Sequence, residues 1–161
     1  MPLSIDAIFD EAENRYLKLD EVNLIGKYVS SLPERITAYR VLRDQEREIF
    51  QQVANQLQAD QPTAAIEQSL RHGILSLRYC AMGLLLDDEE FVQQRLLIWL
   101  SDSIQLHNTS TIDSAFLSIL KQHLSASLSA KQWSLLEPFL SSVETAIPTE
   151  EAEMLTLAGM F

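Results

Sequence analysis

Apolar residues recur every three or four positions along most of this chain, which is the spacing of one face of an α-helix. The longest regular stripe lies between Thr63 and Leu86, and its members are Ile66, Leu70, Ile74, Leu77, Ala81 and Leu84. A second long stripe follows Pro33 and ends before Pro62, because the position before a proline disfavours the α conformation. Leu, Ala, Gln, Glu and Ser dominate the composition, so the pattern predicts an all-α protein.

Shorter apolar stripes predict five further helices, two before Pro33 and three after Asp87, near residues 4–12, 20–32, 91–100, 112–124 and 133–143. Seven or eight helices in 161 residues is the count of a globin-like helical fold with two extra N-terminal helices. We expect one domain overall, made of an N-terminal helical pair, a globin-like body and a C-terminal tail, at residues 1–32, 33–147 and 148–161. Isolated helices as short as the first two are marginal in water, so they are expected to lie against another surface.

Local signals mark several helix boundaries. Asp87 with Glu90 resembles a capping pattern at the start of the fifth helix, and Ser129 with Gln132 forms a capping box for the last one. Pro138 is expected to kink or interrupt that last helix, because proline lacks the N–H that a helix interior requires.

Charge and cysteine content narrow the classes of function. The formal net charge is −11, from 23 acidic and 12 basic residues, so a nucleic-acid backbone would repel the chain unless a basic patch were segregated. The densest basic stretch, residues 35–47, interleaves its arginines with acidic residues and indicates a solvated helix face. Cys80 is the only cysteine, which excludes a disulfide pair and a zinc spacing and is typical of a small buried hydrophobe.

The sequence shows no targeting or membrane-spanning pattern. Its first residues, MPLSIDAIFDEAE, are acidic and lack the pattern of a signal peptide. No apolar run approaches the roughly 18 residues needed to cross a bilayer. We therefore expect a cytoplasmic protein without membrane insertion.

Motifs for catalysis or metal binding are also missing from the sequence. A Gly-rich phosphate loop, a nucleophile elbow and an HExxH pair are all absent, so we expect no enzymatic activity. The histidines, His72, His107 and His123, are interpreted as polar core or surface residues, since no metal-ligand spacing accompanies them. A globin-like fold also admits haem, for which His72 or His123 is the axial candidate.

Four segments, in order, resemble the phycobiliprotein family, the globin-fold subunits of cyanobacterial and red-algal light-harvesting antennae. RITA at 35–38 resembles the family's Arg-Leu-Asp-Ala, and ADQP at 59–62 resembles the Ala-Glu-Gln-Pro that closes the same helix. SLRHGILSLRY at 69–79 resembles Cys-Leu-Arg-Asp followed by Leu-Arg-Tyr, and GLLLDD at 83–88 falls at an apolar run with Gly-Asp. The likeness covers roughly residues 4–147 and implies the family's fold.

The resemblance implies a site for an open-chain tetrapyrrole, or bilin, but three parts of that site differ here. Ser69 stands where the family has the cysteine that bonds the bilin, and a hydroxyl is a far poorer nucleophile than a thiolate. Arg71 is kept where the family's Arg meets a bilin propionate, whereas His72 replaces an Asp that hydrogen-bonds the pyrrole nitrogens. Only six residues separate ADQP from Ser69, where the family has a longer, irregular wall. We therefore expect a lost bilin site and no cofactor.

The family's first two helices form its subunit contact, which implies a partner interface here at Ile5, Ile8, Phe9, Val22, Ile25 and Val29. The implied function is that of a bilin-free adaptor in phycobilisome assembly, turnover or regulation, located with phycobilisomes at the thylakoid surface. Its partner would be a phycobiliprotein subunit, another antenna protein or a second copy of the chain. Two alternatives stay open: the N-terminal helices fold back on their own core, or the protein is a globin-like sensor of haem or a non-covalent bilin.

Overall fold

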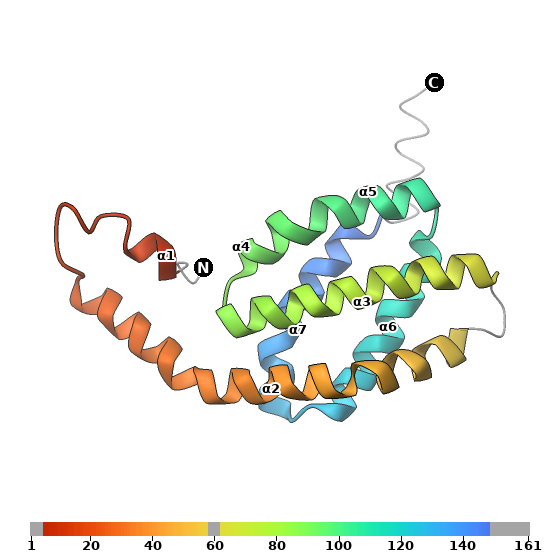
Figure 1. The fold of residues 1–161 in the computed structure, drawn as a ribbon, viewed down its shortest axis with the longest axis horizontal. Coiled ribbons are helices and arrows are strands. Elements are labelled where there is room, and N and C mark those ends of the chain that lie inside the picture. Colours follow the sequence, from red (N-terminus) through yellow and green to blue (C-terminus); the bar gives the residue numbers. More distant parts are fainter. Residues whose placement is uncertain (1–4, 58–61, 149–161) are drawn as a thin grey trace, which may run out of the picture.

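The computed structural model describes residues 5–57 and 62–148, and over these residues the chain is all-α (Figure 1). The α-helices are α1 Ile5–Ile8, α2 Leu19–Leu57, α3 Thr63–Leu86, α4 Glu89–Val92, α5 Ile98–His107, α6 Ser110–Ser127 and α7 Ala130–Ala146. A π-helical segment, η1 Gln93–Leu97, joins α4 to α5. The prediction of an all-helical, globin-like fold is confirmed.

Helix α3 is the centre of the body. It packs against α2, α6 and α7 and also contacts α4 and α5. In Figure 1, α2 lies on one side of α3 and α5 on the other. Fully buried leucines from four helices fill the space between them and include Leu77, Leu84, Leu100, Leu120, Leu136 and Leu140. Each buried leucine contributes about 1.5–3 kcal/mol, so this core is the main source of stability.

Two glycines of α3 allow its neighbours to approach closely. A Cβ atom at Gly73 would overlap the ring of Phe116 on α6, and a Cβ atom at Gly83 would lie 2.6 Å from Cγ2 of Val92 on α4. Neither position has room for a methyl group. The packing therefore requires glycine, although glycine costs about 1 kcal/mol in a helix interior.

Helix α2 is one helix of 39 residues, whereas the sequence analysis predicted separate helices on either side of Pro33. Pro33 lies inside α2, and Figure 1 shows the helix bending in its N-terminal half. Proline has no N–H for the carbonyl four residues earlier, which accounts for a bend and costs about 3 kcal/mol. Contacts on both sides offset this cost, because Tyr28 donates to the carbonyl of Leu85 at 2.9 Å and Arg35 donates to that of Leu84.

The junction between α3 and α4 differs from the predicted cap. Asp87 ends α3 with a left-handed backbone conformation, φ 52°, and its N–H donates to the carbonyl of Leu84 at 3.3 Å. Asp88, not Asp87, caps α4, because its carboxylate accepts the N–H of Phe91 at 3.1 Å. The acidic pair thus closes one helix and opens the next.

Helix α7 begins as predicted. Oγ of Ser129 accepts the N–H of Gln132 at 3.1 Å, and the side chain of Gln132 accepts the N–H of Ser129 at 3.0 Å. Pro138, predicted to kink or interrupt the helix, lies inside α7 and does not interrupt it, since α7 continues to Ala146. Beyond it, positions 149–161 of the predicted tail lie outside the described residues.

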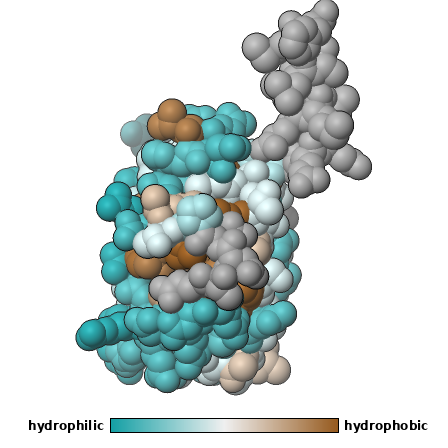
Figure 2. Space-filling view, turned by 90° about the vertical axis from the view of Figure 1, so that its right-hand side faces the viewer, coloured by the Kyte–Doolittle hydropathy of each residue, from teal (hydrophilic) through white to brown (hydrophobic). Residues whose placement is uncertain are grey.

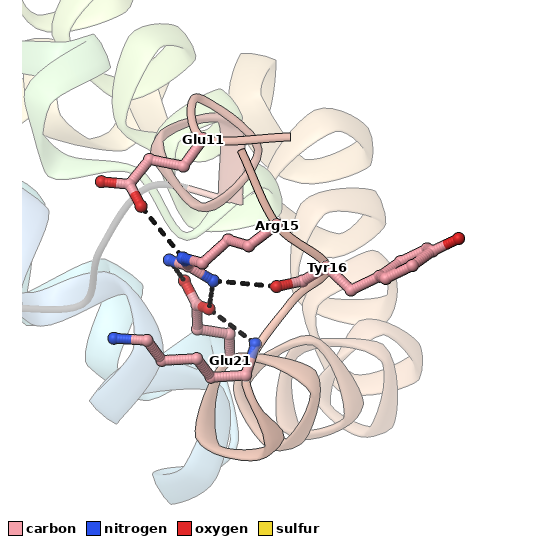
Figure 3. Close-up of polar contacts among 5 residues, drawn as sticks. Glu11, Arg15, Tyr16 and Glu21 are labelled. Atoms are coloured by element: carbon pink, nitrogen blue, oxygen red, sulfur yellow. Dashed lines mark hydrogen bonds and ion pairs between the residues drawn. The ribbon is translucent and has the colours of Figure 1, made fainter. Parts of the chain in front are cut away.

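Residues 5–32 form an N-terminal arm that projects from the body in Figure 1. Its two parts are joined by Arg15, whose guanidinium bonds Glu11 at 2.9 Å and Glu21 at 2.7 Å (Figure 3). Ile8 of α1 is buried, with 4 % of its surface exposed, beside a hollow of about 220 Å³ that residues of α2 and the end of α3 also line. The short helix α1 therefore folds back towards α2.

Candidate functional site

The sequence analysis assigned three residues of the first half of α3 to a lost bilin site: Ser69, Arg71 and His72. They do not share one face of the helix. Ser69 and His72 are three positions apart, share one side of the helix and are 0 % and 2 % exposed. Arg71 is exposed and lines an open pocket. Residues 63–68 are all helical, so no irregular segment precedes Ser69 after Pro62.

Ser69 occupies the interior of the body. Its Oγ is fully buried and has no hydrogen-bond partner. It borders a cavity of about 20 Å³, together with Gly73, Ser76 and Phe116. A cavity of that size admits about one water molecule and no tetrapyrrole.

His72 is the centre of a buried network that joins α3, α5 and α6. Its Nδ1 lies 3.1 Å from both carboxylate oxygens of Asp113 on α6. Its Nε2 lies 2.8 Å from Oγ of Ser103 on α5 and 3.2 Å from the amide nitrogen of Gln68. Thr109 in turn donates to Oδ2 of Asp113 at 2.6 Å.

These partners assign the protons of His72. An ionised carboxylate can only accept, so Nδ1 carries a proton and donates it to Asp113. Ser103 and Gln68 can both donate, so Nε2 accepts from them. Both ring nitrogens are therefore paired inside the chain, and the imidazole is directed at Asp113.

Arg71 borders an open pocket of about 630 Å³ between α3 and α5. Its walls are mostly apolar and carry a few polar groups; the lining residues are Gln68, Arg71, Ile74, Leu75, Trp99, Asp102, Ser103, Leu106 and His107. Figure 2 faces the end of the molecule where α3 begins and α5 ends, and shows apolar surface between hydrophilic margins. Such a combination is typical of a small-molecule site.

A family model described as phycobilisome protein matches residues 9–147. The chain belongs to the phycobilisome protein family. This match covers most of the arm and the whole body, so the resemblance seen in the motifs of α2 and α3 is confirmed. A search of curated proteins found no match. Family membership supports a phycobiliprotein-like role in a light-harvesting antenna.

The six residues predicted to form the subunit contact of this phycobilisome-family chain divide into two groups. About half exposed are Phe9, Val22 and Val29. Partly or fully buried are Ile5, Ile8 and Ile25. Ile8 is buried within its own chain, beside residues of α2 and the end of α3. The apolar surface that remains open is the part formed by the first group.

Two residues of the arm that the sequence analysis did not single out are more exposed than those. Tyr16 is 97 % exposed and Leu19 is 78 % exposed. Both lie at the bend that leads into α2. No local sequence pattern predicted that this bend exposes apolar surface. They extend the open apolar surface of the arm.

Cys80 takes no part in the pocket of this phycobilisome-family chain. It is fully buried in the core and unpaired. Burial raises the pKa of its thiol above the ordinary value, because the thiolate would lose its hydration. The thiol therefore stays protonated and unreactive, and its interpretation as a small buried hydrophobe is confirmed.

The described part of the chain forms neither a metal site nor a membrane span. Within residues 5–57 and 62–148, no group of three or more His, Cys, Asp or Glu side chains is placed to hold a metal ion. Across the same ranges, no helix combines the length and the apolar character that a bilayer span needs.

The sequence analysis missed four members of the network, Gln68, Ser103, Thr109 and Asp113. Asp113 shares the core-facing stripe of α6 with Phe116, Leu117 and Leu120, three, four and seven positions further on. An acidic residue on an apolar stripe signals a buried partner, since an unpaired buried carboxylate is costly. That signal marks Asp113 but does not name His72 as the partner.

Proposed function

We propose that this phycobilisome-family protein carries no covalent bilin and acts by binding other proteins. The pairing of His72 is the observation that carries the proposal. Its imidazole is held by Asp113 and Ser103, at the position where the family places a carboxylate towards the pigment. Ser69, at the anchor position, faces a cavity of about 20 Å³ rather than the pocket that Arg71 borders.

The proposed role is that of an adaptor in phycobilisome assembly, turnover or regulation, at the cytoplasmic side of the thylakoid. The arm is its binding surface. Phe9, Val22 and Val29 leave about half of their surface open on an element that projects from the body. Burying such side chains contributes about 1.5–3 kcal/mol each, which favours association.

The net charge points to the kind of partner. A chain of formal charge −11 repels a second copy of itself at low salt. A partner with a basic rim around an apolar centre is therefore preferred over a homodimer. A phycobiliprotein subunit or another antenna protein is the proposed class.

Co-expression with bilin synthesis and bilin lyases tests the loss of the pigment. Zinc-induced fluorescence on a denaturing gel detects a covalent bilin. We expect no fluorescent band at 18.3 kDa. A fluorescent band at that mass would refute the proposal.

Sedimentation of the full chain, alone and mixed with antenna subunits, tests the arm. We expect Phe9→Asp and Val22→Asp to weaken association by at least about tenfold, because each places a charge on the open apolar surface of the arm. Ile98→Asp is the matched control, since Ile98 is 71 % exposed on the body. The arm would only complete the core if the wild-type chain bound none of the subunits, or if the arm variants associated as strongly as the wild type.

The open pocket favours one second candidate, a sensor of haem or a non-covalent bilin. This candidate is based on the size and lining of the pocket. The pocket has a volume of about 630 Å³ and is lined by Arg71, Trp99 and His107, among others. An absorption spectrum of the purified protein separates the two functions. A colourless protein supports the adaptor, whereas a Soret or red band supports the sensor.

A further inference from the structure

The adaptor role does not explain why Ser103, on the lining of the open pocket, is hydrogen-bonded to His72. We propose that Ser103 is an activated nucleophile, with His72 as its base, that accepts acyl groups from small apolar esters entering the pocket between α3 and α5. Asp113 is the positioning residue of this site. The inference is independent of the adaptor role, because it concerns another surface of the molecule.

The geometry is that of a nucleophile, a base and an orienting carboxylate in sequence. Oγ of Ser103 lies 2.8 Å from Nε2 of His72, and Nδ1 of the same ring lies 3.1 Å from Asp113. The carboxylate holds the ring in the tautomer whose unprotonated Nε2 accepts the serine hydroxyl and can take its proton. Thr109 fixes that carboxylate from its other side at 2.6 Å.

Access separates Ser103 from its neighbours. Ser103 lines the open pocket and is 9 % exposed. Ser69 and Ser76 are 0 % and 3 % exposed and line the cavity of about 20 Å³ instead. Of these three serines, only Ser103 is therefore on the lining that a reagent in the pocket would contact.

The walls of the pocket suggest the class of substrate. Ile74, Leu75 and Trp99 provide apolar and aromatic surface, which favours an aryl ester with a short acyl group. Arg71 is the cation on the same lining and the candidate to face a developing negative charge on the carbonyl oxygen.

The reaction balances without a cofactor. Oγ of Ser103 attacks the ester carbonyl while its proton passes to Nε2 of His72. The carbon–oxygen bond to the leaving alcohol breaks, and the proton passes from His72 to that alcohol or to water. Water then hydrolyses the acyl-serine to the acid and regenerates the hydroxyl.

Turnover is expected to be slow. Ser103 lies inside α5, Ile98–His107, where backbone N–H groups are used by the helix and form no oxyanion hole. Loss of one such donor costs about 10²–10³ in rate. We therefore expect stoichiometric acylation rather than rapid hydrolysis.

Labelling of the full chain with an alkyl fluorophosphonate tests the site. Attack by Ser103 on phosphorus expels fluoride and leaves a stable adduct, which peptide mass spectrometry locates. We expect one adduct, at Ser103, that Ser103→Ala abolishes and Ser69→Ala leaves unchanged. No adduct, or an adduct that persists in Ser103→Ala, would overturn the proposal.

Variants of the base and of its positioning residue distinguish activation from mere exposure. His72→Ala and the nearly isosteric Asp113→Asn are expected to slow labelling of Ser103 by about 10²-fold or more, with the helical circular dichroism spectrum retained. Asp113→Asn serves if His72→Ala does not fold. Labelling at the wild-type rate in a folded variant would show that Ser103 is not activated by this network.

Discussion

Nη1 of Arg35 donates a hydrogen bond of 2.6 Å to the carbonyl oxygen of Leu84, and this contact joins the base of the arm to the end of α3. The same guanidinium lies 3.3 Å from the carboxylate of Asp87 and donates to Oγ of Ser31 at 2.8 Å. Arg35 is only 7 % exposed, so these bonds replace its contacts with water. Together with the bond from Tyr28 to the carbonyl of Leu85, these contacts of Arg35 join the arm to the body.

Replacing Arg35 with alanine is expected to destabilise the protein by about 2–3 kcal/mol, because a buried carbonyl and a carboxylate lose their donor. Urea unfolding followed by circular dichroism measures the change. Arg43→Ala is the control: Arg43 pairs with Asp44 on the surface, where such pairs contribute about 0–1 kcal/mol. Equal effects of the two variants would contradict the importance of the joint.

Alanine at Gly73 and at Gly26 is expected to act in opposite directions. Gly73→Ala forces a methyl group into the ring of Phe116 and costs about 1–3 kcal/mol of stability. Gly26→Ala meets nothing within 4 Å and gains up to about 1 kcal/mol of helix propensity. Thermal and urea unfolding compare the two. If both substitutions stabilised the protein, α6 would be able to move away enough for Phe116 to accommodate the methyl group at position 73.

The carboxyl of Glu21 is expected to titrate far below its ordinary range. Hydrogen bonds from the side chain of Arg15 and then from the N–H of Lys18 lower its pKa from 4.5 to about 2. A carboxyl whose pKa is depressed by folding stabilises the folded arm fully above about pH 4.5, and that contribution is lost as the pH falls through about 2. Titration followed by carboxyl-carbon NMR should place the midpoint near 2. Arg15→Ala should raise the midpoint of Glu21, whereas the control Arg43→Ala should leave it unchanged. An unchanged midpoint in Arg15→Ala would exclude the ion pair.

Cys80 is expected to resist thiol reagents until the protein unfolds. It is 0 % exposed, and burial keeps its thiol protonated. Ellman's reagent at pH 8 should react at least about 100-fold more slowly with the native chain than with the chain in guanidinium. Native labelling at the unfolded rate would mean that the core opens readily at α3.

Ser69→Cys is expected not to restore a red-absorbing pigment. The new thiol would face a cavity of about 20 Å³, and His72 would stay paired with Asp113. Co-expression with bilin synthesis and lyases, followed by an absorption spectrum, checks this, with a bilin-carrying subunit from the same cells as the positive control. A sharp, strong red band in this single variant would show that the anchor was the only loss.

Helix α3 shows what the sequence by itself determined. Its bounds, Thr63–Leu86, follow from an apolar stripe of period 3.6 and from Pro62, and both are properties of neighbouring residues. The capping box of Ser129 and Gln132 is equally local, since its partners are three positions apart. Such signals need no knowledge of what the helix packs against.

Pro33 and His72 show what only the tertiary structure decided. The sequence predicted a break at Pro33, but α2 continues through it because Tyr28 and Arg35 bond the end of α3, about fifty positions further along the chain. His72 is 41 positions from Asp113 and 31 from Ser103, so their hydrogen bonds exist only once α3, α5 and α6 are packed. Local propensity acts over one or two turns of helix, whereas burial and the pairing of polar groups depend on the folded chain as a whole.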